Sequence, residues 1–369
     1  MKQKQFAKRW GTCFVVVLCL MLVINLLWPD TKESTIENRS LQQFPTWSWQ
    51  NVWDGQYQSS ISTWFADQFV GRNVWIHGRY LFLKATQNKK INDVFLAKGQ
   101  LIQDSPKPYW SQINRNIKAI NTLAQNTGIP TSFVLAPTAL SIQKDKIDPA
   151  AISYDQNAMT DRIDKKLDTS IQTVDVRKRL KKHAQEYIYY KTDHHWTSLG
   201  AFYAFQALYP ETKKSDYKQM LVSNSFHGTL SHTTGSVGIT DSIHIFVPKN
   251  QPDYLVTNED DGTRSRTWYH SKAIASNDQY AVFGNGNHAL VRLEMDTNAM
   301  GHLLLIKDSY ANALIPFLIP YYKSITVVDP RYYYGNLHQL IEQDQIDSMM
   351  YVYNVNTFIE DDSLADCLE

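Results

Sequence analysis

An uncharged, mostly apolar run extends from Trp10 to Pro29, directly after a segment that carries Lys8 and Arg9. Its length matches the roughly 20 residues that a helix needs to cross a bilayer. Basic side chains on its amino-terminal side predict a cytoplasmic tail at residues 1–9 and an extracellular location for everything after Asp30. A cleavable signal peptide shares these features. No A-x-A-like site ends the run, so we predict an uncleaved single-pass anchor at residues 10–29.

Residues 30–109 are expected to form a stalk that is followed by a helical and hairpin extension. The first part is polar and extended as far as Trp49. Apolar side chains then recur every four residues from Tyr57 to Phe69, which predicts one helix face that ends near Gly71, and a second helix follows. We expect the segment Phe65–Phe69 to lie in the core. Two short apolar runs at 94–96 and 101–102 predict a hairpin.

From residue 110 onward the pattern alternates between buried strands and amphipathic helices. Continuous apolar runs predict strands at 131–138, 173–176, 302–307, 324–329 and 349–353, with helices between them. This alternation predicts an α/β fold in which helices cover both faces of a parallel sheet. Functional residues of such sheets gather at the carboxyl ends of the strands.

Residues 211–298 have a different texture, richer in Ser, Thr, Gly, Asn and Asp. Short β-like pieces occur at 242–247 and 279–283, so we predict a β-rich insertion or lid within the domain 110–369. The segment Gly284–Asn287 is expected to be a turn. It does not qualify as a phosphate-binding loop, because neither a lysine nor a helix start follows in the required register.

Composition argues against several classes of protein. A net charge of +1 gives no sign of nucleic-acid binding. Cys13, Cys19 and Cys367 form no CxxC motif, which argues against a disulfide framework, thiol catalysis and a cysteine-based zinc site. We therefore expect no metal, no cofactor and no nucleic-acid partner. The abundance of Tyr and Trp suits either a surface that stacks on sugar rings or a large aromatic core.

The candidate chemistry centres on Asp193-His194-His195-Trp196, just before a predicted helix at 198–208. Alternate side chains of an extended segment share a face, so Asp193 and His195 are expected on one side and His194 on the other. Asp193 would then orient His195 as a general base, with His194 and Trp196 as structural or pocket residues. A metal site and a hydrogen-bonded polar core cluster are the alternatives. Adjacent histidines are unusual zinc ligands, and no HExxH spacing is present.

Ser309 is the candidate nucleophile. It stands between the predicted strand 302–307 and a predicted helix that includes 314–321, which is the placement of a nucleophile elbow. Amides at the start of that helix could stabilise an oxyanion. The alternative is a helix N-cap, a position that serine favours. The histidine cluster at another strand end favours the nucleophile, so Ser309, His195 and Asp193 are predicted to form a triad.

Oxyanion and pocket residues are expected at neighbouring strand ends. Asn354 follows the predicted strand 349–353, and Arg331 follows the predicted strand 324–329. A turn-forming asparagine and a surface arginine are the alternative interpretations. Tyr310, next to Ser309, is a further pocket candidate, and Thr138 is a weaker one.

These motifs together resemble the DHHW protein family. That family is similar to the SGNH-hydrolase-like domains of alginate and related exopolysaccharide O-acetyltransferases, in which an Asp-x-His pair precedes the serine, as it does here. The chain differs from ordinary SGNH enzymes in having Lys307-Asp308-Ser309 where they have Gly-Asp-Ser, so the resemblance implies the triad more directly than the oxyanion donors. The segments that carry the resemblance are Glu37–Arg39, Phe65–Phe69, Tyr189–Thr197, Lys307–Asn312, Val328–Tyr332 and Tyr353–Asn354.

The resemblance implies an SGNH-like three-layer fold and a catalytic domain at 110–369 that carries acetyl on Ser309 and passes it to a hydroxyl of a cell-surface or secreted polysaccharide. Acetyl-CoA is unavailable outside the membrane, so a membrane-bound O-acyltransferase partner is expected to supply the acetyl group. A surface carbohydrate acetyl-esterase would use the same residues with water as acceptor, and the choice depends on water exclusion. A non-catalytic glycan-binding or assembly protein on the same fold is the third hypothesis.

Overall fold

The computed structural model describes residues 2–369, and the side chains from residue 5 onward. Met1, the first residue of the predicted cytoplasmic tail, lies outside the described residues. The chain divides into two compact units. The N-terminal unit runs to Gln87 and includes His232–Val237, and the α/β unit comprises Asn88–Ser231 and Gly238–Glu369.

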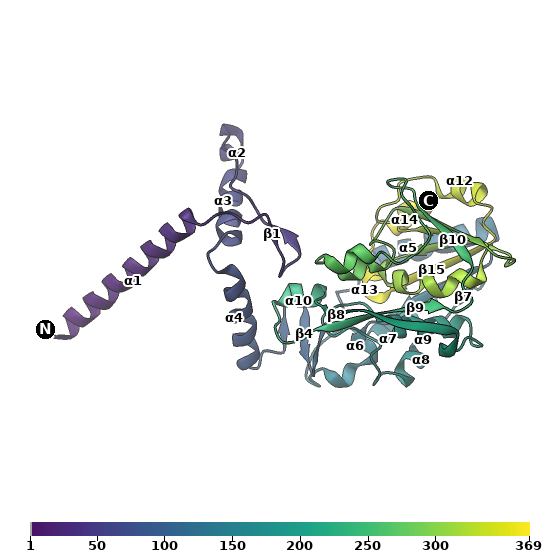
Figure 1. Ribbon diagram of the computed structural model, residues 1–369, viewed down its shortest axis with the longest axis horizontal. Helices are drawn as coiled ribbons and strands as arrows, with labels where there is room; N and C mark the ends of the chain where they lie inside the picture. Colours follow the sequence, from purple (N-terminus) through teal and green to yellow (C-terminus); the bar gives the residue numbers. More distant parts are fainter. Residues whose placement is uncertain (1) are drawn as a thin grey trace. The chain divides into compact units, whose positions relative to one another are not determined.

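The N-terminal unit is mainly helical (Figure 1). Helix α1 (Lys2–Leu27) contains an apolar stretch of 23 residues, long enough to cross a membrane as an anchor or to act as a signal sequence. A two-stranded ribbon follows, made of β1 (Glu33–Ser34) and β2 (Arg39–Ser40). The predicted helix over residues 57–69 and the second helix after Gly71 are confirmed, and Gly55 and Gly71, with φ values of 74° and 67°, precede these two helices. The resulting helices are α2 (Trp49–Trp53), α3 (Gln56–Asp67) and α4 (Arg72–Ala85).

The segment Phe65–Phe69 is buried through its polar residues rather than its aromatic ones. Asp67 and Gln68 are buried, whereas Phe65 is 37% exposed, so the expectation of a core position is wrong for Phe65. Arg39 donates to both carboxylate oxygens of Asp67, at 2.9 and 2.5 Å. Two of the segments that carry the family resemblance therefore meet in one ion pair, which satisfies a carboxylate that would be costly to bury alone.

The α/β unit is built on one eight-stranded sheet of order β11-β10-β12-β14-β13-β15-β6-β7. The five strands from β14 to β7 in that order are parallel. Four of them match predicted strands, whereas β7 overlaps the predicted strand 173–176 only at Thr173. The other three strands extend one edge in antiparallel pairing. The bounds are β6 (Thr131–Ala136), β7 (Ile171–Thr173), β10 (Asp253–Asn258), β11 (Arg264–Ser265), β12 (Leu290–Asp296), β13 (His302–Lys307), β14 (Ser324–Val328) and β15 (Ser348–Asn354).

Alternate side chains of the central strands enter two separate cores. On β13, Leu303 and Leu305 pack with one cluster and Leu304 and Ile306 with the other, as the pleat of a strand requires. The first cluster includes side chains of α8 (Arg177–Lys182), α9 (Ser198–Leu208) and α11 (Ile315–Leu318). The second includes α5 (Trp110–Thr127), α7 (Gln156–Asp164), α12 (Leu337–Gln343), α13 (Val355–Glu360) and α14 (Leu364–Leu368). The expected three-layer α/β fold is confirmed.

Residues 211–298 do not form a single lid. Strands β8 (Tyr217–Phe226) and β9 (Asp241–Pro248) pair with each other, whereas β10, β11 and β12 belong to the main sheet. The predicted strand at 279–283 is instead a short 3-10 helix, η4 (Gln279–Val282). The predicted hairpin at 94–102 is confirmed as β4 (Val94–Ala97) and β5 (Gln100–Gln103), with β3 (Lys90–Ile91) beside them.

Candidate active site

The site lies where the central parallel strands end. Ser309 follows β13, Arg331 follows β14 and Asn354 is the last residue of β15. Parallel strands bring their carboxyl ends to one edge, so residues far apart in sequence meet there. The loop 189–197 reaches the same edge, because the indole Nε1 of Trp196 donates to the carbonyl of Tyr310 at 2.9 Å.

Asp308, not Ser309, caps the turn after β13. Its carboxylate accepts from the backbone N–H of Tyr310 at 2.9 Å at the start of the 3-10 helix η5 (Ser309–Ala313). The Ser309 hydroxyl is therefore available for other partners. The predicted helix at 314–321 is only the four-residue α11 followed by η6 (Ile319–Tyr321), because Pro316 and Pro320 lack the N–H groups that a longer helix needs. The expected helix dipole at Ser309 is correspondingly small.

Ser309, His195 and Asp193 form a continuous hydrogen-bonded chain. The Nε2 of His195 lies 2.8 Å from the Oγ of Ser309, and its Nδ1 lies 2.5 Å from the Oδ1 of Asp193. When the carboxylate holds the proton on Nδ1, Nε2 is left as an acceptor for the serine hydroxyl. Asp193 and His195 are both buried. This is the geometry of nucleophile, base and orienting acid.

The carboxylate of Asp193 is held by a loop from the segment 211–298. The backbone N–H and the hydroxyl of Thr229 donate to its Oδ2 at 2.8 and 3.0 Å. Burial opposes the negative charge, but the imidazoles of His195 and His194 and the Thr229 hydrogen bond hold the pKa of Asp193 below its usual value. At Gly228 a Cβ would lie 2.2 Å from the Cβ of Asp193, so only glycine allows the loop to approach this closely.

Aromatic rings cover both faces of the His195 imidazole. The Tyr280 ring stacks on it with centroids 3.8 Å apart and planes 9° apart, and the His194 ring lies 3.9 Å away at 36°. No ring contact joins Tyr280 and His194 among residues 5–369, so they lie on opposite faces. The Tyr280 hydroxyl also donates to the backbone carbonyl of Ser309 at 3.1 Å.

The strand-like alternation expected for residues 193–195 is wrong, although it singled out the pair that meets Ser309. The chain bends through residues 191–195, and the His194 ring packs against His195 instead of pointing away from it. The bend is stabilised by Asp241, whose carboxylate accepts from the backbone N–H groups of Lys191 and Thr192 at 2.8 and 2.7 Å. The sequence contained no local signal for this contact, because Asp241 lies about 50 positions further along.

Trp196 and Tyr310, predicted as structural or pocket residues, are completely buried. The Tyr310 hydroxyl donates to the backbone carbonyl of His194 at 2.5 Å, which together with the Trp196 indole bond fixes the histidine loop to the serine loop. His194 retains 25% side-chain exposure beside the base. These contacts place Trp196 and Tyr310 between the two loops, and of the three residues His194 alone has a partly exposed side chain.

The side chain of Asn354 is already occupied by hydrogen bonds to its neighbours. Its amide nitrogen donates to Asp308 at 2.5 Å and to the hydroxyl of Thr357 at 2.7 Å, and its oxygen accepts from the Thr357 backbone N–H at 3.0 Å. As an oxyanion donor, Asn354 would have to break one of these bonds. Its position instead supports Asp308. Burial raises the pKa of Asp308 above its usual value, and the backbone N–H of Asn354 and the charge of Arg331 oppose this shift.

Arg331 donates to both oxygens of Asp329, at 2.8 and 2.6 Å, and the buried ammonium of Lys307 lies 3.2 Å from the same carboxylate. Burial lowers the pKa of Lys307, and the charge of Asp329 opposes that shift. Arg331 is close enough to His194 for its charge to lower the pKa of that imidazole. Among the described residues its Nη1 makes no hydrogen bond, so Arg331 retains a donor group that is not used by Asp329. Thr138, in contrast, is bound to Gln156.

A metal could use donor atoms of Asp193, His194 and His195, which lie within 4.8 Å of one another. In the structure, however, the two nitrogens of His195 are directed at Asp193 and Ser309. A metal at this position would take His195 away from the serine. The hydrogen bonds of His195 in this structure are those that a general base would make.

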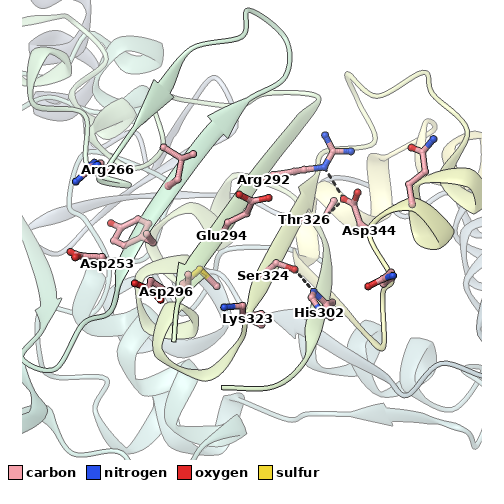
Figure 2. A pocket seen from close by; sticks show the side chains of 15 residues that line it. Asp253, Arg266, Arg292, Glu294, Asp296, His302, Lys323, Ser324, Thr326 and Asp344 are labelled. Carbon is pink, nitrogen blue, oxygen red and sulfur yellow. Dashed lines mark hydrogen bonds and ion pairs between the residues drawn. The ribbon is translucent and has the colours of Figure 1, made fainter. Parts of the chain in front are cut away.

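A second serine–histidine pair lies at the opposite edge of the sheet. A pocket of about 760 Å³ opens there, and in it the Nδ1 of His302 is 2.7 Å from the Oγ of Ser324, while Arg292 pairs with Asp344 (Figure 2). No carboxylate contacts the His302 ring among the residues with described side chains. Without an orienting acid this pair lacks the third member that the chain of hydrogen bonds at Ser309 has.

Comparison with known proteins agrees with this fold. The chain has a mixed α/β fold in which a serine, a histidine and an aspartate meet at the carboxyl ends of the parallel strands. A family model described as DHHW protein matches residues 100–328. The chain belongs to the DHHW family. Comparison with curated proteins gives no match.

Solved structures share the fold. A DHHW family protein from Eubacterium siraeum gives a TM-score of 0.66 at 22% identity, over 76% of this chain and 95% of that one. Bacillus cereus PatB1 with a sulfonyl adduct gives 0.62 at 21% identity, over 73% of this chain and 97% of that one. The O-acetyltransferase domain of Pseudomonas putida AlgJ gives a TM-score of 0.44 at 13% identity, over 74% of this chain and 94% of that one. The first two likenesses establish a common architecture.

Replacing Tyr280 tests its support of the base. Tyr280→Leu removes the stacked ring, and we expect kcat/KM for acetyl-ester turnover to fall about tenfold, since such ring pairs contribute ~0.5–1.5 kcal/mol. Tyr280→Phe keeps the ring and loses only the bond to the Ser309 carbonyl, so a smaller loss is expected. Equal losses in the two variants, with unchanged thermal unfolding, would contradict a role for the stack.

His194 predicts a pH dependence of stability. Burial and then the charge of His195 lower the pKa of His194 to about 4, against an ordinary value of 6.5. The unfolded chain therefore binds this proton more readily, and the contribution to stability is complete above pH ~6.5 and is lost as the pH falls towards ~4. The free energy of unfolding, measured with urea, should fall more over this pH range for the wild type than for His194→Gln. If the free energy of unfolding depends on pH in the same way in both proteins, His194 keeps an ordinary pKa in the folded state.

Proposed function

We propose that the protein is a membrane-anchored extracellular O-acetyltransferase that moves an acetyl group through Ser309 to hydroxyls of a cell-surface or secreted polysaccharide. The observation that carries the proposal is the chain from Ser309 Oγ to His195 Nε2 at 2.8 Å and from His195 Nδ1 to Asp193 at 2.5 Å. Membership of the DHHW family and the SGNH-like fold support the same reaction class.

In the first half-reaction the Ser309 oxygen attacks the carbonyl carbon of the acetyl donor. His195 Nε2 takes the serine proton and becomes an imidazolium, which the carboxylate of Asp193 stabilises. When the tetrahedral intermediate collapses, the bond to the donor oxygen or sulfur breaks and His195 returns the proton to that leaving group. The product is an acetyl ester on Ser309.

In the second half-reaction a sugar hydroxyl attacks the acetyl-serine. His195 removes the proton of that hydroxyl, and the new ester bond forms as the bond to Ser309 breaks. The proton then returns to the serine oxygen. Arg331 is the proposed donor to the oxyanion in both steps, because its charge lies near the site and its Nη1 has no other partner among the described residues.

The proposed location explains the source of the acetyl group. Helix α1 is long enough to hold the chain in a single-pass orientation, with residues 1–9 in the cytoplasm and the α/β unit outside. Acetyl-CoA does not reach that side of the membrane, so we propose a membrane-bound O-acyltransferase as the partner that exports acetyl. The acceptor is a polysaccharide, and no nucleic acid, cofactor or metal takes part.

Serine substitution tests the site directly. For the full-length protein in detergent, Ser309→Ala should reduce acetyl-ester turnover by a factor on the order of 10³ or more, because it removes the nucleophile of the triad. Ser324→Ala is the matched control, since Ser324 pairs with a histidine but has no orienting carboxylate (Figure 2). If Ser324→Ala abolishes turnover and Ser309→Ala does not, the assignment is reversed.

A sulfonyl reagent gives a second readout. Bacillus cereus PatB1 is known with a sulfonyl adduct. We expect a sulfonyl fluoride to add one sulfonyl group to this protein at Ser309, seen by intact-protein and peptide mass spectrometry, and not to the Ser309→Ala variant. Acetate release compared with transfer to added oligosaccharide then separates a transferase from an esterase. If Ser309 does not react with the sulfonyl fluoride at all, the non-catalytic alternative is favoured.

A further inference from the structure

Large apolar side chains are exposed on the outward face of α4 in the N-terminal unit. Val74 is 73% exposed, Trp75 58%, Leu81 51% and Phe82 66%. Positions 74 and 75 lie two turns before positions 81 and 82, so all four side chains are on one side of the helix, and Gly78 lies between the two pairs. Soluble proteins expose single apolar residues commonly but contiguous stripes rarely, so this face is expected to be covered.

The opposite face of α4 is already used. Tyr80 is buried, and the ring of His77 is 2.9 Å from the carbonyl of Gly235 within the same unit. A Cβ at Gly235 would lie 2.3 Å from the Cγ2 of Ile76, which shows how closely the chain packs on this side. The exposed stripe is therefore a second apolar surface of α4, separate from the side that packs within the unit.

The charged side chains of α4 have one sign, and Arg72 at its start pairs with Glu37. From Gln68 to Asn92 the sequence contains no acidic residue, and Arg72, Arg79 and Lys84 lie on α4 itself. A helix that combines Trp, Phe and Leu on one side with flanking Lys and Arg is the type that lies in a membrane interface, where the rings enter the headgroup region and the cations meet anionic lipid.

Hydrogen bonds connect the start of α4 to the outer end of α1. The side-chain oxygen of Asn25, in the last turn of α1, accepts from the backbone N–H of Val70 at 2.6 Å. The indole of Trp64 donates to Asp30 at 2.7 Å, and Gln68 bonds the backbone of Thr31 at 2.9 and 3.0 Å. Residue 70 is thus held at the level where the apolar stretch of α1 ends, and α4 begins two residues later. Figure 1 shows α3 and α4 running across the axis of α1 at that end.

We propose that α4 lies in the outer interface of the bilayer that α1 crosses, with Val74, Trp75, Leu81 and Phe82 inserted among anionic phospholipid headgroups. A span of about 23 residues ends at the depth where interfacial aromatics are most stable, and the bond from Asn25 places α4 there. The predicted free stalk after residue 30 is then replaced by a second, surface attachment. This inference rests on the proposed anchoring by α1.

The test uses the full-length chain in nanodiscs of phosphatidylcholine and phosphatidylglycerol. Cys13→Ser, Cys19→Ser and Cys367→Ala remove the native thiols, and Phe82→Cys then accepts a fluorophore that responds to polarity. We expect its emission to shift to the blue and to be quenched by lipids that carry a nitroxide near the headgroup. Met300→Cys is the control, because Met300 is 88% exposed and lies in the loop between β12 and β13.

Each outcome decides the proposal. Blue-shifted and quenched emission at position 82 alone supports it, and Trp75→Cys should behave in the same way. Water-like emission at position 82, or equal quenching at positions 82 and 300, overturns it. Burial at position 82 in native membranes but not in pure lipid discs also overturns it, since a protein partner would then cover the stripe. Retention of the chain in the discs and sulfonylation of Ser309 in the same sample report separately on α1 and on the proposed function.

Discussion

The burial of one carboxylate, Asp193, is the constraint on which the site depends. A charge in such a place is stable only when donors surround it, and Asp193 has the imidazole of His195 at 2.5 Å and the backbone and hydroxyl of Thr229 at 2.8 and 3.0 Å. These contacts leave the imidazole one orientation, with Nε2 directed at Ser309. The position of the base is therefore fixed by the electrostatic requirement of its neighbour and not by the histidine itself.

Much of that support comes from the part of the chain with the least regular sequence pattern. Residues 211–298 supply Gly228 and Thr229 against Asp193, Asp241 against the bend at 191–192, and Tyr280 against His195. The same segment adds β10, β11 and β12 to the sheet. A segment that looks like an insertion in the sequence is thus part of the structural framework of the site.

The sequence predicted the parts of the structure that depend on local pattern. Apolar runs located four of the five parallel strands and the neighbourhood of β7, and residue type together with strand ends indicated Ser309, His195 and Asp193. Contacts between distant residues could not be predicted in this way. Tyr280 had no marker, because its role comes from a 3-10 turn that places it beside a histidine 85 positions earlier. Phe65 was misplaced and the contacts of Asn354 were not foreseen for a related reason: helical spacing and strand ends do not show which polar groups a residue must satisfy.

The coverage of His195 on both faces limits how acyl transfer can proceed. An imidazole held between Tyr280 and His194, and bonded at both nitrogens, has no room to rotate between two positions. One nitrogen must then serve the departing donor and the arriving acceptor in turn, at the same place above Ser309. The donor would have to leave before the acceptor enters, so the proposed reaction would follow double-displacement kinetics, in which the acetylated protein is a free species between the two substrates.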